Sequence, residues 1–343
     1  MRKVVIVGAG RIFTKHYEAL KLLSKNFKIV GVFDKKKSIN LKSSKLCKTP
    51  LFQNVHDLIK KTNPDIISIL VESGRHLEVC KNIISKHAVK NFIIEKPLDV
   101  SAKKILNFNK FIKNKNINIF TVKQNRFNKA VIKAKEIIEK KLIGDLFMIS
   151  ASCKWRRDQS YYNLSKWRGK RNLDGGVLMN QAIHHIDLLI YFAGDIINVS
   201  GYGDTRFIKM ESENIAVASL KFKNGCIGTI EATTATAPRD YEGSITIMGS
   251  KGMIKIGGFA SNKLEHVSNQ SGIKLNLEKF SSNIGSVYGH GHVEFYKYVN
   301  SYLQGSIKKN QFDIPYAIKS VQVVESIVKS FTTRNKIVLK KFI

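Results

Sequence analysis

Strand-like and helix-like segments alternate through the first 122 residues of this 343-residue chain. The strand-like runs are residues 3–7, 29–33, 66–71, 91–94 and 117–122, and the helical stretches between them include 12–23, 54–62, 75–87 and 101–114. The runs are apolar without a polar alternation, which is typical of parallel strands covered on both faces. This order predicts an α/β domain, a doubly wound parallel sheet, over residues 1–122.

A different pattern follows residue 122. A helix is expected at 128–140, closely spaced strands at 146–155, 196–205, 214–222, 226–235, 243–248 and 252–256, and final helices near 291–304 and 315–330. Turn sequences such as Lys223-Asn224-Gly225 separate the strands and favour antiparallel pairing. The Ser-, Asn- and Gly-rich stretch 261–286 is expected to be a mobile loop. We therefore expect a second, α+β domain with a large, mainly antiparallel sheet over residues 123–343.

The formal net charge of +32 comes from 58 basic and 26 acidic side chains. Only 11 of the basic residues are Arg, whereas 47 are Lys, and the Lys are spread along the whole chain. Proteins that read nucleic acids tend to use the bidentate fork of Arg. A basic nucleic-acid binder therefore stays an alternative only, and we expect no nucleic-acid partner.

The four cysteines, Cys47, Cys80, Cys153 and Cys226, form no Cys-x-x-Cys pair and have no His at zinc-ligand spacing. We expect buried, reduced thiols and no metal site. The N-terminal residues lead directly into a strand without a signal-peptide pattern, and no run of 18 apolar residues occurs. The expectation is a cytoplasmic protein without a membrane-spanning helix.

Residues 8–13, Gly-Ala-Gly-Arg-Ile-Phe, join the first expected strand to the first expected helix. They match the dinucleotide motif G-x-G-x-x-G except that Phe13 stands at the third glycine. Gly8 permits a tight turn, and Gly10 lets a pyrophosphate approach the backbone at the helix N-terminus. The context of strand, glycine loop and helix predicts a Rossmann domain that binds a dinucleotide.

Asp34 stands at the end of the second expected strand. A carboxylate at this position accepts a hydrogen bond from the ribose 2′-hydroxyl of NAD and repels the 2′-phosphate of NADP. The three lysines that follow, residues 35–37, are a competing signal because they suit a phosphate. We expect NAD to be the cofactor.

Two further segments carry candidate catalytic residues. Glu95-Lys96-Pro97 closes the fourth expected strand, so Lys96 lies at the carboxyl edge of the sheet, where such folds bind ligands. Asn180 and His184 are four residues apart in a helix expected over 177–192 and share one face. We expect His184 to take the proton of a substrate hydroxyl as the hydride leaves, with Lys96 and Asn180 holding that hydroxyl.

These segments together resemble the Gfo/Idh/MocA oxidoreductases over essentially the whole chain. The resemblance rests on the Gly8/Gly10 loop, Ser73-Gly74-Arg75-His76, Glu95-Lys96-Pro97 and the Gly-Gly…His-His-Ile-Asp segment, residues 175–187. It implies a Rossmann domain that binds NAD, a sheet domain that forms homo-oligomers (dimers or tetramers), and catalysis by Lys96 and His184. Many members carry Asp where this chain has Asn180, and Thr-Pro where it has Val71-Glu72.

Within that family, residues 122–128, 155–162, 167–169 and 179–181 resemble the UDP-N-acetyl-2-amino-2-deoxyglucuronate dehydrogenases of the WlbA/WbpB type. By this resemblance Asn180 is a regular residue of the subgroup. It implies NAD-dependent oxidation of the 3-hydroxyl of a UDP-linked N-acetylglucosaminuronic acid to a 3-keto sugar, an EC 1.1.1-type step in lipopolysaccharide O-antigen synthesis. It also raises the recycling of bound NAD by 2-oxoglutarate.

The residue types agree with an anionic nucleotide sugar. Arg156, Arg157, Arg168 and Arg171 lie within 16 residues, and Arg forks suit diphosphate and carboxylate oxygens. The expected cofactor-binding residues are Gly8, Gly10, Arg11, Ile12, Asp34, Ser73, His76, Glu95, Gln124, Trp167 and Arg168. The expected substrate-binding residues are Lys96, Arg156, Arg157, Tyr161, Asn180 and His184.

Two other functions stay open at this point. Because a fold does not fix a substrate, the chain is alternatively another sugar or cyclitol dehydrogenase of the same fold. A non-catalytic protein that binds NAD is the second alternative, against which the presence of both Lys96 and His184 argues.

Overall fold

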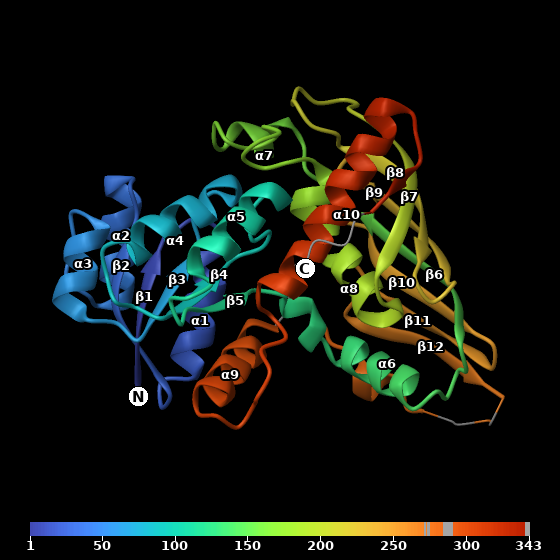
Figure 1. Ribbon diagram of the computed structural model, residues 1–343, viewed down its shortest axis with the longest axis horizontal. Coiled ribbons are helices and arrows are strands. Elements are labelled where there is room, and N and C mark those ends of the chain that lie inside the picture. The colour runs from blue at the N-terminus through green and yellow to red at the C-terminus, as the bar shows by residue number, and fades with distance from the viewer. Residues whose placement is uncertain (271, 273–274, 284–290, 340–343) are drawn as a thin grey trace. The chain divides into compact units, whose positions relative to one another are not determined.

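The computed structural model describes residues 1–270, 272, 275–283 and 291–339. By their contacts the residues form two compact units (Figure 1). Unit 1 consists of residues 1–122 and 292–318, and unit 2 of residues 123–291 and 319–343. Segment 292–318 therefore groups with unit 1, although the sequence analysis assigned it to the second domain.

The sheet of unit 1 has five strands in the order β2-β1-β3-β4-β5. They are β1 (Arg2–Val7), β2 (Phe27–Phe33), β3 (Ile66–Ile69), β4 (Asn91–Ile94) and β5 (Asn118–Thr121). Every pair is parallel, and β3 is buried along its whole length. The structure confirms the predicted doubly wound sheet, because apolar runs without alternation need cover on both faces.

The helices that accompany this sheet are α1 (Phe13–Leu22), α2 (Lys37–Cys47), α3 (Val55–Thr62), the short 3-10 helix η1 (Ser73–Arg75), α4 (His76–Ile84) and α5 (Ala102–Ile112). Asn54 and Ser101 cap α3 and α5, since their side chains accept backbone N–H groups of the first turn. The sequence analysis named no helix at α2. That helix has no side-chain cap and is rich in Lys and Ser. It therefore lacks both a capping residue and a clear apolar stripe, which are the usual helix signals in a sequence.

Helix α9 (Gly291–Leu303) explains why segment 292–318 belongs to unit 1. Tyr296 of α9 is fully buried, and its ring packs edge-on against His16 of α1 at 5.7 Å and Phe27 of β2 at 5.5 Å. An amphipathic pattern shows that a helix packs against something without naming its partner. The return of the chain to unit 1 is therefore not visible in the sequence.

Unit 2 is built on an eight-stranded sheet in the order β12-β11-β10-β6-β9-β8-β7-β13. The strands are β6 (Leu146–Lys154), β7 (Ile196–Asp204), β8 (Ile215–Phe222), β9 (Ile227–Thr233), β10 (Glu242–Gly249), β11 (Gly252–Gly257), β12 (Lys263–Asn269) and β13 (Ile337–Val338). Neighbouring strands are antiparallel except β6 and β9, which run parallel. The large, mainly antiparallel sheet is confirmed.

Strand β12 corrects the expectation of a mobile loop over 261–286. Residues 263–269 pair with β11. The short 3-10 helix η4 (Glu278–Phe280) follows. The pairing contains a register shift between Lys255 and Ile256, which interrupts the two-residue period that marks a strand in a sequence. Residues 271, 273–274 and 284–286 of the expected loop lie outside the described residues.

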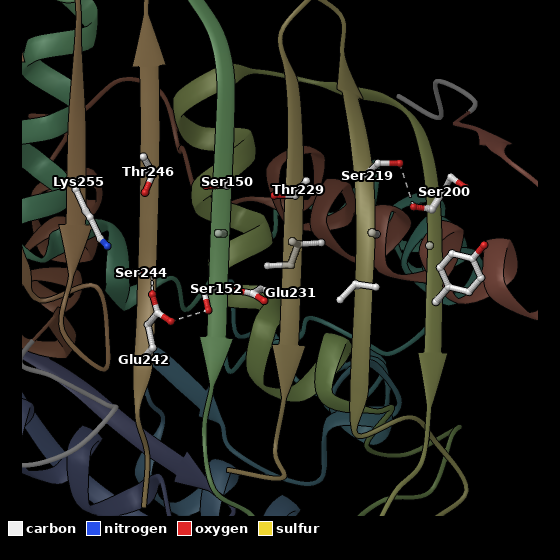
Figure 2. A pocket seen from close by; sticks show the side chains of 16 residues that line it. Ser150, Ser152, Ser200, Ser219, Thr229, Glu231, Glu242, Ser244, Thr246 and Lys255 are labelled. Carbon is white, nitrogen blue, oxygen red and sulfur yellow. Dashed lines mark hydrogen bonds between the residues drawn. The ribbon is translucent and has the colours of Figure 1, made fainter.

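The other helices that the structure describes in unit 2 are α6 (Lys129–Glu139), α7 (Gln159–Asn163), α8 (Ile183–Ala193) and α10 (Ile314–Thr333), whose first turn lies in unit 1. In β8 and β9 buried and exposed residues alternate, so one face of the sheet is covered and the other is open (Figure 2). None of the helices described is both long enough and apolar enough to cross a membrane.

All four cysteines are free. Cys80, Cys153 and Cys226 are buried as expected, but Cys47 is only half-buried at the end of α2. Partial burial raises the pKa of the Cys47 thiol to about 12. A thiol with so high a pKa is a poor nucleophile at neutral pH.

Candidate cofactor and catalytic sites

The site residues expected in unit 1 follow the carboxyl ends of its strands. Gly8 and Gly10 follow β1, Asp34 follows β2, Ser73 and His76 follow β3, and Glu95 and Lys96 follow β4. Because the strands are parallel, all of these ends lie at one edge of the sheet, where open α/β folds bind their ligands.

The two glycines of the loop are required for different reasons. Gly8 has a φ of +94°, and a Cβ there would lie 2.6 Å from the carbonyl carbon of Leu70, so the fold itself excludes any side chain. A Cβ on Gly10 would meet no atom of the described residues within 4 Å. The packing of the chain therefore leaves room beside Gly10, which fits the close approach of a pyrophosphate.

Phe13 occupies the position of the third glycine and is the first residue of α1. Its side chain is 4% exposed and stacks on Tyr17 one turn later, with 6.2 Å between ring centroids. The third glycine of the motif serves close packing of helix and strand. Aromatic packing takes that role here, and the change leaves the backbone of Gly10 accessible.

Asp34 is tied to the glycine loop. Its Oδ2 accepts a hydrogen bond from the Ala9 N–H at 2.8 Å, and its Oδ1 accepts one from the Lys36 N–H at 2.8 Å. Each carboxylate oxygen keeps a further lone pair for a ribose hydroxyl. The same side chain thus sets the shape of the loop and carries the negative charge that disfavours a 2′-phosphate.

Lys35 forms an ion pair with Glu72, the residue that departs from the Thr-Pro of many relatives. Burial acts to raise the pKa of Glu72, but the hydrogen bond and charge of Lys35 lower it below its usual value. Glu72 is therefore an ionised, compensated carboxylate. Because Lys35 is engaged in this pair, the lysine cluster at 35–37 is a weaker phosphate site than the sequence suggests.

His76 connects two parts of the edge. Its Nδ1 lies 2.7 Å from the Pro97 carbonyl oxygen and its Nε2 3.1 Å from the Val71 carbonyl oxygen. Both contacts stay within unit 1, and burial lowers the pKa of the ring. His76 was expected to bind the cofactor. In the structure its ring contacts the backbone of Pro97 and thus supports the segment that contains Lys96.

Glu95 is 5% exposed and directs its carboxylate into unit 1. Its Oε1 faces His16 Nε2 at 2.9 Å, and its Oε2 accepts the N–H of Lys96 at 3.0 Å. Lys96 itself is half-buried. The most distinctive tripeptide of the sequence therefore consists of a buried carboxylate followed by a more accessible ammonium group.

In unit 2, Asn180 and His184 lie on one continuous helix. Residues Leu178–Ala182 form a π-helical turn that leads directly into α8. The helix expected over 177–192 covers this turn, but its π-helical geometry was not expected. Such turns occur often at functional sites. The Asn180 amide donates to Asp174, and His184 is 8% exposed.

Glu213 caps the start of this helix and was not found from the sequence. Its backbone oxygen accepts the Val177 N–H at 2.9 Å, and its Oε1 accepts the Leu178 N–H at 3.2 Å. A Cβ on Gly176 would lie 2.1 Å from the Glu213 carboxylate, so the second glycine of the Gly-Gly pair provides space for this cap. Burial raises the pKa of Glu213 to about 7.

Asp187, on α8, forms a buried ion cluster that the sequence analysis also missed. It accepts from Arg126 through Nε at 2.7 Å and Nη2 at 2.8 Å, and it pairs with Lys123. Burial acts to raise the pKa of Asp187, but the two cations lower it to about 2. Burial lowers the pKa of Lys123 to about 8. The cluster joins α8 to the 3-10 helix η2 (Gln124–Phe127).

Gln124 lies on η2 and is 2% exposed. Its Oε1 is buried and has no hydrogen-bond partner among the residues that the structure describes. A buried acceptor without a partner costs roughly 1–3 kcal/mol. A ligand that donates a hydrogen bond here would recover this free energy, which is consistent with the expected role of Gln124 in cofactor binding.

Two of the four clustered arginines converge on one ring. The Arg168 guanidinium lies 4.2 Å from the centroid of Tyr161 and 4.8 Å from that of Trp167, and it donates to the Tyr161 hydroxyl. Arg157 lies over the same Tyr161 ring at 5.4 Å and over Trp155 at 5.7 Å. The structure thus brings together two cations and three aromatic rings that carry a polar group.

The other two arginines are engaged elsewhere. Arg156 donates to the Thr236 carbonyl at 3.2 Å and pairs with Asp158 at 3.3 Å. Arg171 is exposed and donates to the Glu211 carbonyl at 3.1 Å. Neither contact involves Tyr161, so the run of four arginines in the sequence does not form a single patch.

Family models match both units. One, described as an oxidoreductase family with an NAD-binding Rossmann fold, matches residues 2–122, and the GFO/IDH/MocA C-terminal domain matches residues 131–255. The chain belongs to the Gfo/Idh/MocA oxidoreductase family. It is therefore an oxidoreductase with an NAD-binding domain, and the glycine loop with Asp34 is the part of unit 1 that fits this cofactor.

Similar proteins of known structure or function cover most of the chain. A solved WlbA dehydrogenase from Bordetella pertussis, in complex with NADH and UDP-GlcNAcA, is 28% identical with a TM-score of 0.93 and covers 99% of this chain and 98% of its own. The WlbA enzyme of Chromobacterium violaceum, with the same ligands, is 27% identical with a TM-score of 0.90 and covers 100% and 97%. Myo-inositol 2-dehydrogenase of Thermotoga maritima is 26% identical over 77% of this chain and 76% of that protein.

Removing the Asp34 carboxylate should shift the cofactor preference. In Asp34→Ala the acceptor for the ribose hydroxyl and the repulsion of a 2′-phosphate are both lost, so the ratio of NAD to NADP affinity should fall by about tenfold or more. Titration of both oxidised cofactors by calorimetry measures the ratio. Asp34→Asn is the matched control for the loop, since its amide oxygen still accepts the Ala9 N–H. An unchanged ratio in Asp34→Ala would show that Asp34 does not select the cofactor.

Glu213 should make unit 2 less stable as the pH rises. The pKa in the folded state, about 7, exceeds the ordinary 4.5, so its contribution is complete below pH 4.5 and is lost as the pH rises through 7. The loss is on the order of 3 kcal/mol above pH 8. Glu213→Gln, neutral throughout, should show a smaller fall of Tm between about pH 4.5 and 7.5. Glu211→Gln, at an exposed neighbour, should behave like wild type, and parallel curves for all three proteins would refute the assignment.

Proposed function

We propose that the protein oxidises the 3-hydroxyl of a UDP-linked N-acetylglucosaminuronic acid to a 3-keto sugar with NAD as oxidant. The observation that carries the proposal is the similarity to two solved enzymes that hold NADH and UDP-GlcNAcA, at TM-scores of 0.93 and 0.90. Both similarities extend over almost the whole of each chain. The chemistry of the residues described above supports the same substrate class.

The proposed chemistry needs three side chains. His184, as the neutral imidazole, takes the proton of the substrate hydroxyl. The Lys96 ammonium donates a hydrogen bond to the hydroxyl oxygen and favours its deprotonated form. Asn180, itself oriented by Asp174, holds the same hydroxyl. NAD, when bound, supplies the acceptor for the hydride that leaves the carbinol carbon.

The proposal assigns the anionic groups of the substrate to unit 2. Arg157 and Arg168, which share the Tyr161 ring, offer planar forks for diphosphate or carboxylate oxygens. Arg157 also pairs with Asp240 at 2.9 Å, so its guanidinium is held in place before a ligand arrives. A preorganised fork loses less conformational entropy on binding than a mobile one. Arg156, with contacts of its own, has the weaker support.

Further parts of the proposal concern partners and cellular role. We place the reaction in lipopolysaccharide O-antigen synthesis in the cytoplasm, with 2-oxoglutarate as an oxidant that regenerates bound NAD. A homodimer or homotetramer would form through the open face of the unit 2 sheet, which presents Ser152, Ser244 and Glu242 side by side (Figure 2). This face has hydroxyl and carboxylate groups on neighbouring strands beside the exposed Tyr202 and Val217.

A second candidate function comes from the myo-inositol 2-dehydrogenase of Thermotoga maritima, which matches 77% of this chain. In this alternative the substrate is an uncharged cyclitol or sugar. The same Lys96 and His184 chemistry would apply, but Arg157 and Arg168 would have no anion to bind. The two functions therefore differ in the charge of the substrate.

A substrate panel separates these functions. We expect NADH formation, followed at 340 nm, with UDP-N-acetylglucosaminuronic acid and none above background with UDP-N-acetylglucosamine, myo-inositol or levoglucosan. The physical reason is that the arginines stabilise a sugar carboxylate that all three of these compounds lack. Each assay is run with and without 2-oxoglutarate, because regenerated NAD hides the NADH signal and the keto product must then be detected by mass spectrometry. Turnover of myo-inositol alone would establish the alternative.

Replacing Lys96 tests the catalytic assignment. Lys96→Met keeps the length of the side chain but loses the ammonium group, so kcat should fall by about 100-fold or more. The Kd of NADH should change far less, because the glycine loop and Asp34 are intact. Lys90→Met, at an exposed lysine just before β4, is the matched control and should retain wild-type kcat. Near-normal turnover in Lys96→Met would remove Lys96 from the mechanism.

A further inference from the structure

A chain of buried polar groups runs through unit 1 to the backbone of Lys96. Ser68 Oγ lies 3.1 Å from the Tyr296 hydroxyl, which lies 2.8 Å from His16 Nδ1. His16 Nε2 lies 2.9 Å from Glu95 Oε1, and Glu95 Oε2 accepts the Lys96 N–H at 3.0 Å. Ser68, Tyr296 and His16 are fully buried, and Glu95 is 5% exposed.

One assignment of protons satisfies every contact in this chain. The Lys96 N–H can only donate, so Glu95 Oε2 accepts. If Glu95 is ionised, His16 Nε2 carries the proton and donates to Oε1, which leaves His16 Nδ1 as acceptor of the Tyr296 O–H. The Tyr296 oxygen then accepts the Ser68 O–H. The assignment uses a neutral His16, consistent with burial lowering the pKa of His16, and each member fixes the next.

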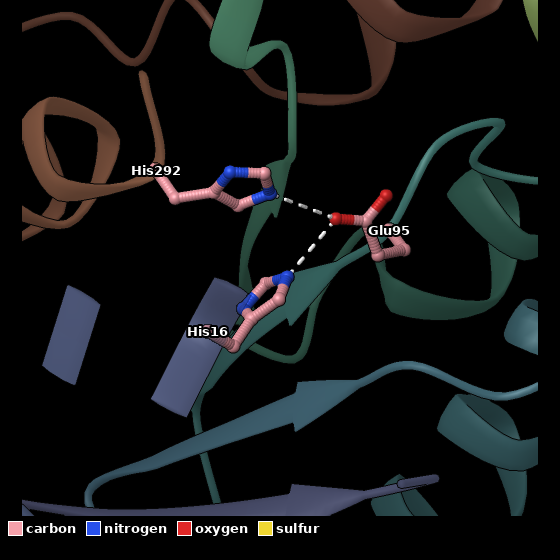
Figure 3. A group of neighbouring side chains, drawn as sticks. All are labelled: His16, Glu95 and His292. Carbon is pink, nitrogen blue, oxygen red and sulfur yellow. Dashed lines mark hydrogen bonds and ion pairs between the residues drawn. The ribbon is translucent and has the colours of Figure 1, made fainter. Parts of the chain in front are cut away.

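His292 faces the same carboxylate oxygen as His16 (Figure 3). Its Nε2 lies 3.5 Å from Glu95 Oε1, and its ring packs edge-on against His16 at 5.0 Å. Burial acts to raise the pKa of Glu95, but the two histidines hold it well below its usual value. The carboxylate is therefore kept charged in an interior that would otherwise neutralise it.

The two histidines and Glu95 also offer donor atoms within 4.8 Å of one another, which suits a metal ion. A metal would need the lone pair of His16 Nε2. In the observed arrangement that atom is at hydrogen-bond distance from Glu95, and the proton assignment above places a hydrogen on it. The observations therefore favour a hydrogen-bonded network, and a bound metal becomes an outcome of the test.

We propose that His16, Glu95 and Tyr296 are positioning residues that hold the peptide of Lys96 and thereby aim its side chain. This inference rests on the proposed catalytic role of Lys96. His16 belongs to α1, the helix that follows the glycine loop, and Glu95 directly follows β4, so the network joins α1 to the segment that carries the lysine. A displacement of about 1 Å at a reacting group costs up to about 100-fold in rate, which makes such a support necessary.

The experiment compares two replacements of His16. His16→Gln keeps an amide that can donate to Glu95, whereas His16→Leu is of similar size and cannot donate. We expect kcat to fall by about tenfold or more in His16→Leu and in Glu95→Gln, and by less than about threefold in His16→Gln. The KM and the Kd of NADH should change by less than about threefold in all three, because the buried His16 and Glu95 side chains engage each other and the Lys96 N–H. Each variant is measured on the substrate that gives wild-type turnover.

Two further variants separate positioning from folding. Tyr296→Phe removes one hydroxyl from the network and keeps the ring, so it should lower kcat modestly while circular dichroism and Tm stay close to wild type. Tyr298→Phe, on the same helix but bonded to the Lys309 carbonyl outside the network, is the matched control and should keep wild-type kcat. If Glu95→Gln fails to fold, the His16 pair and Tyr296→Phe still decide the question.

Three results would overturn the inference. Equal kcat values for His16→Leu and His16→Gln would show that donation to Glu95 is irrelevant. A rise in KM, or a fall in cofactor affinity, that accounts for the whole loss of activity would show a role in binding. A stoichiometric metal in the purified protein, absent from His292→Gln, would make the cluster a metal site. Loss of activity in Lys96→Met with full activity in Glu95→Gln would reject only the positioning role, whereas full activity in Lys96→Met would reject both.

Discussion

Burying a carboxylate costs several kcal/mol unless donors and cations compensate it. Each unit contains one such buried and compensated carboxylate next to a candidate catalytic residue. Glu95 in unit 1 precedes Lys96 and is held by His16 and the Lys96 N–H. Asp187 in unit 2 lies one turn beyond His184 and is held by Arg126 and Lys123. Because a buried charge is stable only beside its partners, each carboxylate fixes the chain that carries it. The candidate catalytic side chains thus extend from backbone that these hydrogen bonds and ion pairs hold in place.

The glycine loop is fixed by a related arrangement with a carboxylate nearer the surface. Asp34 accepts the Ala9 N–H, so the negative charge that suits a ribose also shapes the loop that suits a pyrophosphate. A glycine is required at position 8 because the backbone of Leu70 comes close to it. Beside Gly10, by contrast, no atom of the described residues fills the space. One glycine therefore serves the fold and the other serves the ligand.

The sequence predicted those features that depend on neighbouring residues. The five parallel strands follow from apolar runs, and Gly8, Gly10, Asp34 and Lys96 follow from their positions at strand ends. The network around Glu95 could not be predicted, because Glu95 is 79 residues from His16, and His16 is 280 residues from Tyr296. The cap by Glu213 is 35 residues from Leu178. Pairs at such separations leave no local pattern in the sequence. In β12, a bulge interrupts the alternation that would have marked the strand.

The lysines and the arginines of this chain contribute to its positive charge in different ways. Lys outnumbers Arg by 47 to 11, so the positions of the few arginines are informative. Arg126 binds Asp187 through two nitrogens, and Arg157 and Arg168 stack on the Tyr161 ring. Both arrangements need a planar guanidinium, which an ammonium group cannot replace. Much of the +32 charge is carried by exposed lysines, which attract anions only weakly and without orientation in salt. Arg157 and Arg168 are held in a defined direction by the Tyr161 ring, which suits the anionic substrate that we propose.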